Sequence, residues 1–318
     1  MTRLLLALAL LLSTAASHAQ QVVHIVVPFA AGGVQDILAR TIAPDFAALI
    51  GRNVIVENRT GASGTIGNAY VAKSAPDGNT LLLAAASHTI TGHVYPKLPY
   101  HPLNDFSAVA HIGTIDYLLI ANAELPVKNV AELVAYAKAN PGKLNYATAG
   151  AGSATHLSMA YFASLAGIDV VHIPLKGTNE AINEVLAGRS HLVIASTIGA
   201  LGFLKDNRVR MLGVTGAVRS KFAPELPTLA EAGAGVGLRN YVFDSWLGLL
   251  GPAGIPKATM DQYNGAMAKI LQSPSMLEKL DKQGIVPKAM TPEAFMALLR
   301  ENSAAMAAVV KAAGAKVD

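Results

Sequence analysis

Cysteine is absent from all 318 residues of the chain, which excludes stabilising disulfides and a lipid-modified amino-terminal cysteine. Charged residues are scarce as well, at 14% of the sequence against roughly 25% in an average domain. Hydrophobic residues make up 52%. We therefore expect stability to come from large apolar cores, and sheets that are buried on both faces.

Long apolar runs and basic tracts are also missing from the chain beyond its first twenty residues. No such run reaches the roughly 20 residues of a membrane-spanning helix. The 25 Lys and Arg residues barely outnumber the 21 Asp and Glu residues and are scattered, so nothing indicates a nucleic-acid-binding protein. The glycine-rich turns contain neither G-x-G-x-x-G nor G-K-[ST], and no serine lies in G-x-S-x-G, which argues against nucleotide sites and serine hydrolases.

The first twenty residues have the pattern of a cleavable export signal. Arg3 supplies the positive start, residues 4–12 are apolar, and Ser17 and Ala19 form a small-x-small cleavage site. Nine apolar residues are too few to span a bilayer, so this segment is not a membrane anchor. We expect an exported protein whose mature chain begins at Gln20 or Gln21.

Short apolar segments alternate with helical patterns along the rest of the chain. This rhythm is typical of α/β proteins with mostly parallel sheets flanked by helices. The remaining length of roughly 300 residues exceeds the size at which a single core keeps growing, so two domains are expected. The Gly/Pro-rich stretches 121–126 and 233–246 are the candidate crossings. We therefore predict one domain from residues 21–122 plus 244–318 and a second from 123–243, with a cleft between them.

Several helix starts are indicated by capping residues. Asn129 precedes a helical pattern with a Glu three positions later, and Ser273 and Thr291 each precede a proline. These are favoured N-terminal sequences, because a side-chain oxygen accepts from the free N–H groups of the first turn. Thr178 is predicted to cap the helix that follows it.

Glycine-containing turns in residues 30–36, 60–67 and 148–156 each precede a helical segment. Such a turn directs free N–H groups and the positive end of a helix toward one edge of a sheet, where an anion can bind. Two of the turns belong to the first predicted domain and one to the second, as a ligand clamped between domains requires. About four or five hydrogen bonds of roughly 1.5–3 kcal/mol each could supply the ~8 kcal/mol of a micromolar site. Each turn alone also fits a glycine that needs no ligand.

The histidines do not have the spacing of a metal site. His88 and His93 have no acidic ligand beside them, and His156, His172 and His191 are dispersed. We therefore expect neither a metal nor another cofactor. A structural role is the default for each histidine, but His88 and His156 directly follow proposed binding segments and remain candidates.

Asp36 and Asp244 each have more than one possible role. Asp36, in the first turn of a helix, either complements the helix dipole, orders the glycine turn, or accepts from a ligand group. Asp244 either faces the cleft or bonds the backbone of a crossing segment. Lys176, near a strand end, fits a solvated lysine.

These motifs together resemble the substrate-binding proteins of tripartite tricarboxylate transporters, the Bug or TctC family. The resemblance runs in order from about residue 22 to the end of the chain. The stretches are VPFAAGGVQDILAR, VENRTGASGTIGNAYVAKSAPDGNTLLL, ELPVKNVAELVAYAKANPGKLNYATAGAGSATHL, HIPLKGTNEAINEVLAG, LPTLAEAG and GPAGIP. The resemblance implies a monomeric type II-like periplasmic binding protein that closes on a small carboxylate and delivers it to integral membrane transport subunits.

The resemblance also implies a set of ligand-binding residues. In the family, backbone amides and ordered waters of the loops corresponding to 29–36 and 61–67 hold the carboxylate. The implied residues are Phe29, Ala31, Gly32, Asp36, Ser63, Gly64, Ser87, His88, Gly152, Ser153, Thr155, His156, Thr197 and Asp244. Ala31 replaces a common proline of the family and Leu175 a common aromatic residue, which puts the identity of the ligand in doubt. Dicarboxylates, tricarboxylates, acidic amino acids and aromatic acids remain open.

Two other functions stay open at this stage. The same fold could present its closed form to a signalling partner as a ligand sensor. An enzyme would need a nucleophile, and Ser153 with His156 is the available pair.

Overall fold

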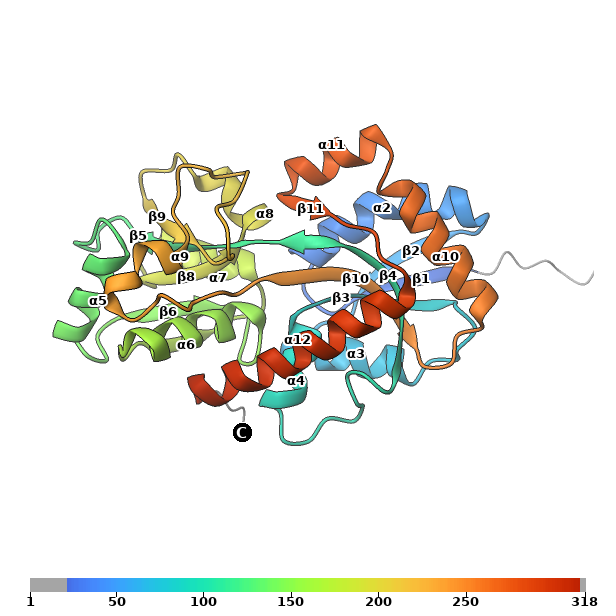
Figure 1. The fold of residues 1–318 in the computed structure, drawn as a ribbon, viewed down its shortest axis with the longest axis horizontal. Coiled ribbons are helices and arrows are strands. Elements are labelled where there is room, and N and C mark those ends of the chain that lie inside the picture. The colour runs from blue at the N-terminus through green and yellow to red at the C-terminus, as the bar shows by residue number, and fades with distance from the viewer. Residues whose placement is uncertain (1–21, 315–318) are drawn as a thin grey trace, which may run out of the picture.

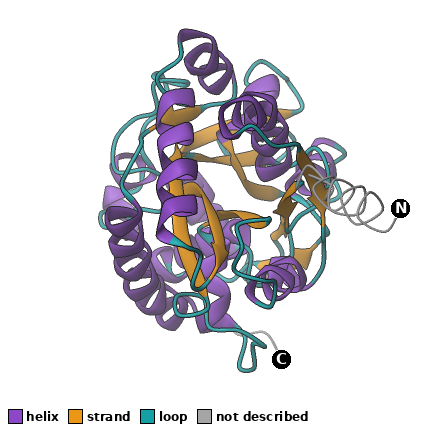
Figure 2. Ribbon diagram, turned by 90° about the vertical axis from the view of Figure 1, so that its right-hand side faces the viewer, coloured by secondary structure: helices purple, strands orange, loops and turns teal. Residues whose placement is uncertain are grey.

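The computed structural model describes residues 22–314 of the chain. Two lobes lie side by side, each built from one β-sheet flanked by helices (Figure 1). Seen from the side, the strands lie inside and the helices outside (Figure 2). Within residues 22–314 no helix is long and apolar enough to cross a membrane. The predicted export signal, residues 1–20, lies outside the described residues.

The first lobe contains a six-stranded sheet. β1 pairs in parallel with β2 and β3, whereas β10 pairs antiparallel with β3 and β4, and β11 antiparallel with β4. In spatial order the strands are β11 (Ile285–Pro287), β4 (Phe106–Ile115), β10 (Ser245–Pro252), β3 (Thr80–Ala85), β1 (Val23–Val27) and β2 (Val54–Asn58).

The second lobe contains a five-stranded sheet. β6 pairs in parallel with β7 and β8, and β5 pairs antiparallel with β8 and β9. In spatial order the strands are β7 (Val171–Pro174), β6 (Asn145–Thr148), β8 (Leu192–Ser196), β5 (Tyr117–Asn122) and β9 (Val209–Val214). Both sheets are therefore mixed, and the prediction of mostly parallel sheets was too simple. In the first sheet, the chain leaves for the second lobe along β4 and comes back from it along β10. These neighbouring strands therefore run in opposite directions.

The chain first passes from one sheet to the other at Asp116, because β4 ends one residue before it and β5 begins one residue after it. It returns before Ser245, the first residue of β10. β4 and β10 run side by side where the lobes meet (Figure 1). The first crossing thus lies before the 121–126 stretch in which we expected it. Residues 110–121 are mostly apolar and have no Gly or Pro within two positions of Asp116, so the pattern did not reveal this point.

The helices begin largely where the capping residues predicted. Asn129, Ser273 and Thr291 cap α5, α11 and α12 through their side chains, whereas α7 is capped by Gly177 and not by Thr178. The helices are α2 (Val34–Ile50), α3 (Thr65–Ala72), α4 (Ser87–Val94), α5 (Val130–Ala139), α6 (Ala154–Ala166), α7 (Thr178–Leu186), α8 (Thr197–Ala200), α9 (Leu229–Ala232), α10 (Lys257–Ile270), α11 (Pro274–Lys282) and α12 (Pro292–Ala313). Short 3-10 turns cover Ala62–Gly64, Leu201–Phe203 and Ala234–Val236.

The central strands β8 and β5 of the second lobe are buried on both faces, as the low charge content predicted, whereas the edge strand β7 is partly exposed. On β5, Leu118 and Ile120 belong to an apolar cluster confined to this lobe, whereas Leu119 and Ala121 belong to the larger cluster that extends through both lobes. Alternate residues of a strand point to opposite faces of a sheet. Helices on both sides of β5 therefore cover apolar side chains.

Candidate functional site

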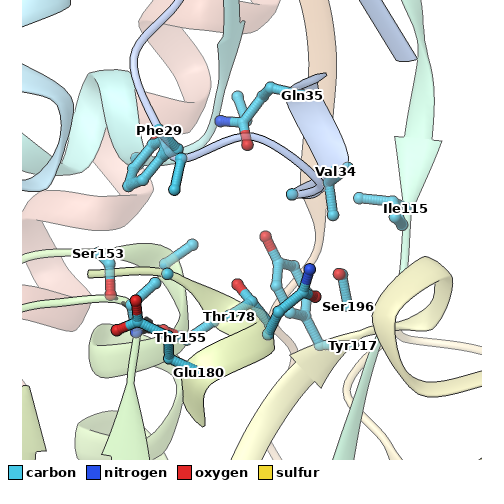
Figure 3. A pocket seen from close by; sticks show the side chains of 18 of the residues that line it. Phe29, Val34, Gln35, Ile115, Tyr117, Ser153, Thr155, Thr178, Glu180 and Ser196 are labelled. Carbon is cyan, nitrogen blue, oxygen red and sulfur yellow. Dashed lines mark hydrogen bonds between the residues drawn. The ribbon is translucent and has the colours of Figure 1, made fainter. Parts of the chain in front are cut away.

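A cavity of about 130 Å³ lies between the lobes (Figure 3). We call it the first cavity. It is lined by the turns that precede α2, α6 and α7 and by the ends of strands from both sheets. The lining residues are Phe29, Ala30, Ala31, Gly33, Val34, Gln35, Ala85, Ser87, Ile115, Tyr117, Ala149, Ser153, Ala154, Thr155, Gly177, Thr178, Asn179, Glu180, Ser196 and Leu247.

Three helix N-termini meet at the first cavity. α6 is capped by Ser153, whose Oγ accepts from the backbone N–H of His156 at 3.2 Å. α2 and α7 begin after Gly33 and Gly177, and no side chain within residues 22–314 caps either helix. First-turn N–H groups have no acceptor inside their own helix, and the helix dipole adds partial positive charge. The first cavity therefore offers free donors from both lobes to an anionic or accepting group.

A second cavity, of about 450 Å³, adjoins the first. The two share Phe29, Ala30, Ala149 and Glu180. All three glycine turns that we singled out reach the second cavity, including the turn of residues 60–64 that the first cavity lacks. Its lining residues are Pro28, Phe29, Ala30, Thr60, Gly61, Ala62, Ser63, Gly64, Tyr95, Ala149, Gly150, Ala151, Leu175, Lys176 and Glu180.

Hydrogen bonds join the loops of the two lobes beside these cavities. The Asn179 side-chain amide donates to the carbonyl oxygen of Gly32 at 2.9 Å. The hydroxyls of Ser63 and Tyr95 both donate to the carbonyl oxygen of Ala151, the latter at 3.2 Å. The turns before α2, α3 and α6 and the first turn of α7 thus contact the opposite lobe directly.

The structure brings five of the fourteen candidate residues to the first cavity: Phe29, Ala31, Ser87, Ser153 and Thr155. Ser63 and Gly64 line the second cavity together with Phe29. Thr155 has a local role too, because its Oγ1 accepts from the backbone N–H of Ala149 at 2.9 Å. The other seven candidates lie outside the two sets of lining residues.

Asp36 orders the turn before α2. Its carboxylate is buried and accepts from the Gly32 N–H at 2.9 Å, from Asn58 Nδ2 at 3.0 Å and from Arg40 Nε at 3.0 Å. Burial by itself raises the pKa of Asp36, but the hydrogen bonds from Arg40, Gly32 and Asn58 outweigh it and hold the pKa below its ordinary value. Gly32, with φ of 77°, lies in the left-handed region that favours glycine.

The two candidate histidines are packed within their own lobes. His88 Nε2 bonds the carbonyl oxygen of Pro102 at 2.7 Å, and its ring packs edge-on against Phe106. His156 Nδ1 accepts from the N–H of Gly152 at 3.1 Å, and its ring stacks on His172 with centroids 4.1 Å apart.

Both histidines are neutral at physiological pH. Burial lowers the pKa of His88 to about 4, and burial together with the charge of His172 lowers the pKa of His156 to about 4. Ser153 Oγ contacts the backbone N–H of His156 and the hydroxyl of Thr155, whereas the His156 ring nitrogen Nδ1 is engaged by Gly152. The bonds in which Ser153 and His156 take part are those of a helix start, not of a nucleophile and its base.

The last two candidates lie where the lobes meet. Thr197 is buried, and its hydroxyl donates to the carbonyl oxygen of Gly284 in the first lobe at 3.1 Å. A Cβ added at Gly216 would lie 3.1 Å from a carboxylate oxygen of both Asp116 and Asp244. Desolvation and the charge of Asp116 raise the pKa of Asp244 to about 6.

Sequence reasoning missed several residues that line the first cavity. Gly177, Thr178 and Asn179 escaped notice because we assigned Thr178 to capping. Tyr117 is the first residue of β5 and Ser196 the last residue of β8. A polar residue at the end of an apolar strand is the sequence pattern that could have identified them. No group of three His, Asp or Glu side chains suited to a metal occurs in the part of the chain that the structure describes.

Comparison with known proteins gives one family. The model of the tripartite tricarboxylate transporter family receptor, TctC, matches residues 38–315. A UPF0065 protein from the tcbD-tcbE intergenic region of a Pseudomonas species is 33% identical over 308 residues, which cover 95% of this chain and 91% of that protein. Protein BugT of Bordetella pertussis is 30% identical over 327 residues, covering 100% of this chain and 99% of BugT.

Solved structures show the same two-lobed fold. Rpa4515 of R. palustris, solved with adipate, has a TM-score of 0.88 at 33% identity and covers 95% of this chain and 100% of its own. The periplasmic binding protein BugD has a TM-score of 0.85 at 31% identity, covering 94% and 99%. MatC of Rhodopseudomonas palustris, with bound malate, has a TM-score of 0.83 at 30% identity, covering 91% and 98%. This chain belongs to the TctC receptor family of two-domain periplasmic binding proteins, and it is a solute-binding protein and not an enzyme.

Proposed function

We propose that this chain is a periplasmic receptor that captures a small carboxylate in the first cavity and delivers it to the integral membrane subunits of a tripartite transporter. The observation that supports this most directly is the meeting of three helix N-termini from both lobes at one cavity. Relatives at 33% and 30% identity were solved with the carboxylates adipate and malate.

The carboxylate is bound by uncharged donors. None of the lining residues that the structure describes around the first cavity is Lys, Arg or His. The first-turn N–H groups of α2 and α7 are free of side-chain caps and belong to opposite lobes. A carboxylate that accepts from both helices therefore favours the closed arrangement. About four or five charge-assisted hydrogen bonds are sufficient for micromolar affinity.

Isothermal titration calorimetry against monocarboxylates, dicarboxylates, tricarboxylates, acidic amino acids and aromatic acids tests this function. We expect one class to bind with micromolar affinity or better. Val34, at the first position of α2, provides a matched pair of variants. Val34→Asp places a negative charge among the donors and should weaken binding about tenfold or more relative to Val34→Asn, which has nearly the same shape. No binding across the panel, or equal affinity of the two variants, would contradict the proposal.

Export, oligomeric state and partner are part of the same proposal. We propose that residues 1–20 direct the chain to the periplasm and that it acts there as a monomer. Cell fractionation and size-exclusion chromatography test these two points. Affinity capture from detergent-solubilised membranes, with and without the ligand found by calorimetry, should recover integral transport subunits. Recovery of a signalling kinase in their place would identify a sensor.

A further inference from the structure

Two side chains that carry hydroxyl groups line the first cavity from neighbouring strands. Tyr117 on β5 and Ser196 on β8 are direct partners in the antiparallel register, so their side chains lie on the same face of the sheet. Both line the first cavity, and they are only 7% and 1% exposed. Figure 3 shows the Tyr117 hydroxyl pointing into the cavity and the Ser196 side chain to the side of the Tyr117 ring.

The Ser196 hydroxyl has no protein partner within the described residues, and its Oγ is buried. A buried polar group is rarely left without a hydrogen bond in native structures, so a water or a ligand group in the cavity is expected to bond it. Burial raises the pKa of Tyr117 against the effect of a hydrogen bond with Ser245, so its hydroxyl stays protonated. A hydroxyl group both donates and accepts, so Tyr117 keeps capacity for a second partner.

Apolar side chains make up part of the first cavity, beside the polar side chains of Gln35, Thr178, Asn179 and Glu180. Ile115 and Leu247 line the same cavity and come from the strands that meet at the crossing between the lobes. Phe29, in the turn before α2, and Val34, the first residue of α2, add apolar surface. With no cationic side chain among the described lining residues, a second carboxylate at the hydroxyl pair would lose water without gaining an opposite charge. An uncharged hydroxyl can donate and accept there without that cost.

We propose that Tyr117 and Ser196 form a subsite for a hydroxyl group, and that the ligand is a monocarboxylate whose apolar body ends in this hydroxyl. The inference rests on the proposed function, because it takes the carboxylate to be bound at the starts of α2 and α7. It adds the chemistry of the opposite end of the ligand.

Two series of ligands test the subsite by calorimetry. One comprises hexanoate, its ω-hydroxy derivative and adipate, and the other benzoate, para-hydroxybenzoate and terephthalate. Within a series only the distal group changes, from apolar to hydroxyl to carboxylate. We expect the hydroxy acid of at least one series to bind about tenfold more tightly than both of its companions.

Ser196→Ala and Tyr117→Phe should each reduce the affinity for that hydroxy acid about tenfold and change the affinity for its apolar companion less than about twofold. Ser196→Ala should leave the melting temperature of the free protein unchanged or higher, since the hydroxyl has no partner to lose. Ser158 is the matched control: it is fully buried but bonds Tyr241 Oη at 2.7 Å. Ser158→Ala should lower the melting temperature and leave the affinity unchanged.

The outcomes separate the two proposals. A dicarboxylate or an apolar acid that binds more tightly than the hydroxy acid, or a Ser196→Ala variant with unchanged affinity for it, would overturn the hydroxyl subsite and leave the carboxylate receptor intact. Failure of every member of both series to bind would also overturn the subsite. Silence across the wider carboxylate panel, or equal affinity of the two Val34 variants, would overturn the proposed function.

Discussion

At the scale of single residues, polar groups near the cleft divide into those that order the protein and those that face a ligand. The Asp36 carboxylate accepts hydrogen bonds from Gly32, Asn58 and Arg40. Ser196 has no partner for its hydroxyl among the described residues. Both are buried polar side chains, and only their hydrogen-bond partners distinguish them. Hydrogen-bond satisfaction is therefore the better guide to a ligand-facing role.

Asp36→Asn should destabilise the protein by about 2 kcal/mol, because a buried carboxylate that accepts charge-assisted bonds is replaced by an amide. Arg40→Gln should have a smaller effect, since the Arg40 side chain is 52% exposed and the Asp36 side chain 5%. Urea denaturation followed by circular dichroism measures both. Equal effects for the two variants would indicate that the ion pair, and not the ordered turn, is what Asp36 contributes.

His88 should make stability dependent on pH. Its pKa is lowered to about 4 in the folded state, against about 6.5 when unfolded. The unfolded state therefore binds more protons between these values, and stability is lost as the pH falls from 6.5 toward 4. His88→Gln should remove up to about 1.4 kcal/mol of this loss per pH unit.

The measurement is the free energy of unfolding of both proteins at several pH values between about 4 and 7.5, which includes the whole interval over which His88 titrates. We expect the difference between wild type and His88→Gln to shrink as the pH falls. Two parallel curves would show that His88 is not the titrating group.

At the scale of elements, the cap of each helix determines whether the N–H groups of its first turn are available to a ligand. Asn129, Ser273 and Thr291 cap their helices with side chains and leave fewer donors for anything else. Gly33 and Gly177 have no capping side chain, and α2 and α7 both start at the first cavity. A missing cap is a small loss of helix stability that leaves donors for a ligand.

Gly177→Asp should stabilise the free protein and weaken ligand binding. The backbone at Gly177 is extended, with φ of −168°, and an added Cβ meets Ala30 Cβ at 3.8 Å, so a side chain fits. An aspartate there can cap α7, worth a few tenths of a kcal/mol over glycine, and its charge competes with the ligand carboxylate. Gly177→Asn caps without the charge and is the control.

Thermal denaturation and calorimetry measure the two effects on the same samples. We expect a slightly higher melting temperature for both variants and a loss of affinity of about tenfold for Gly177→Asp alone. Unchanged affinity in Gly177→Asp would mean that the start of α7 does not contact the ligand.

At the scale of the whole molecule, contacts between the lobes define the closed arrangement. α12 begins in the first lobe and packs against α4, β4 and α6. Near its end, the carbonyl oxygen of Ala312 accepts from Ser164 Oγ at 2.7 Å. Together with the bond from Asn179 to Gly32, such contacts set the balance between open and closed forms.

Asn179→Ala should shift the protein toward open forms, because it removes the bond from α7 to Gly32 at the edge of the cleft. We expect a larger radius of gyration in small-angle X-ray scattering of the free protein and faster ligand dissociation. Asn183→Ala changes an exposed residue of the same helix and serves as the control. Identical scattering and dissociation rates for the two variants would show that the Asn179 bond does not influence closure.

The sequence by itself determined the class of fold, the caps of α5, α11 and α12, and the glycine turns before α2 and α6, because these depend on neighbouring residues and local backbone conformation. It also contained enough family motifs to indicate a carboxylate receptor. Only the tertiary structure decided that the start of α7 lines the site and that the Asp36 carboxylate bonds groups of the protein. It also decided that Tyr117 and Ser196 are partners on neighbouring strands. These facts depend on strand register and on how two lobes close, and both arise from contacts between residues far apart in the chain.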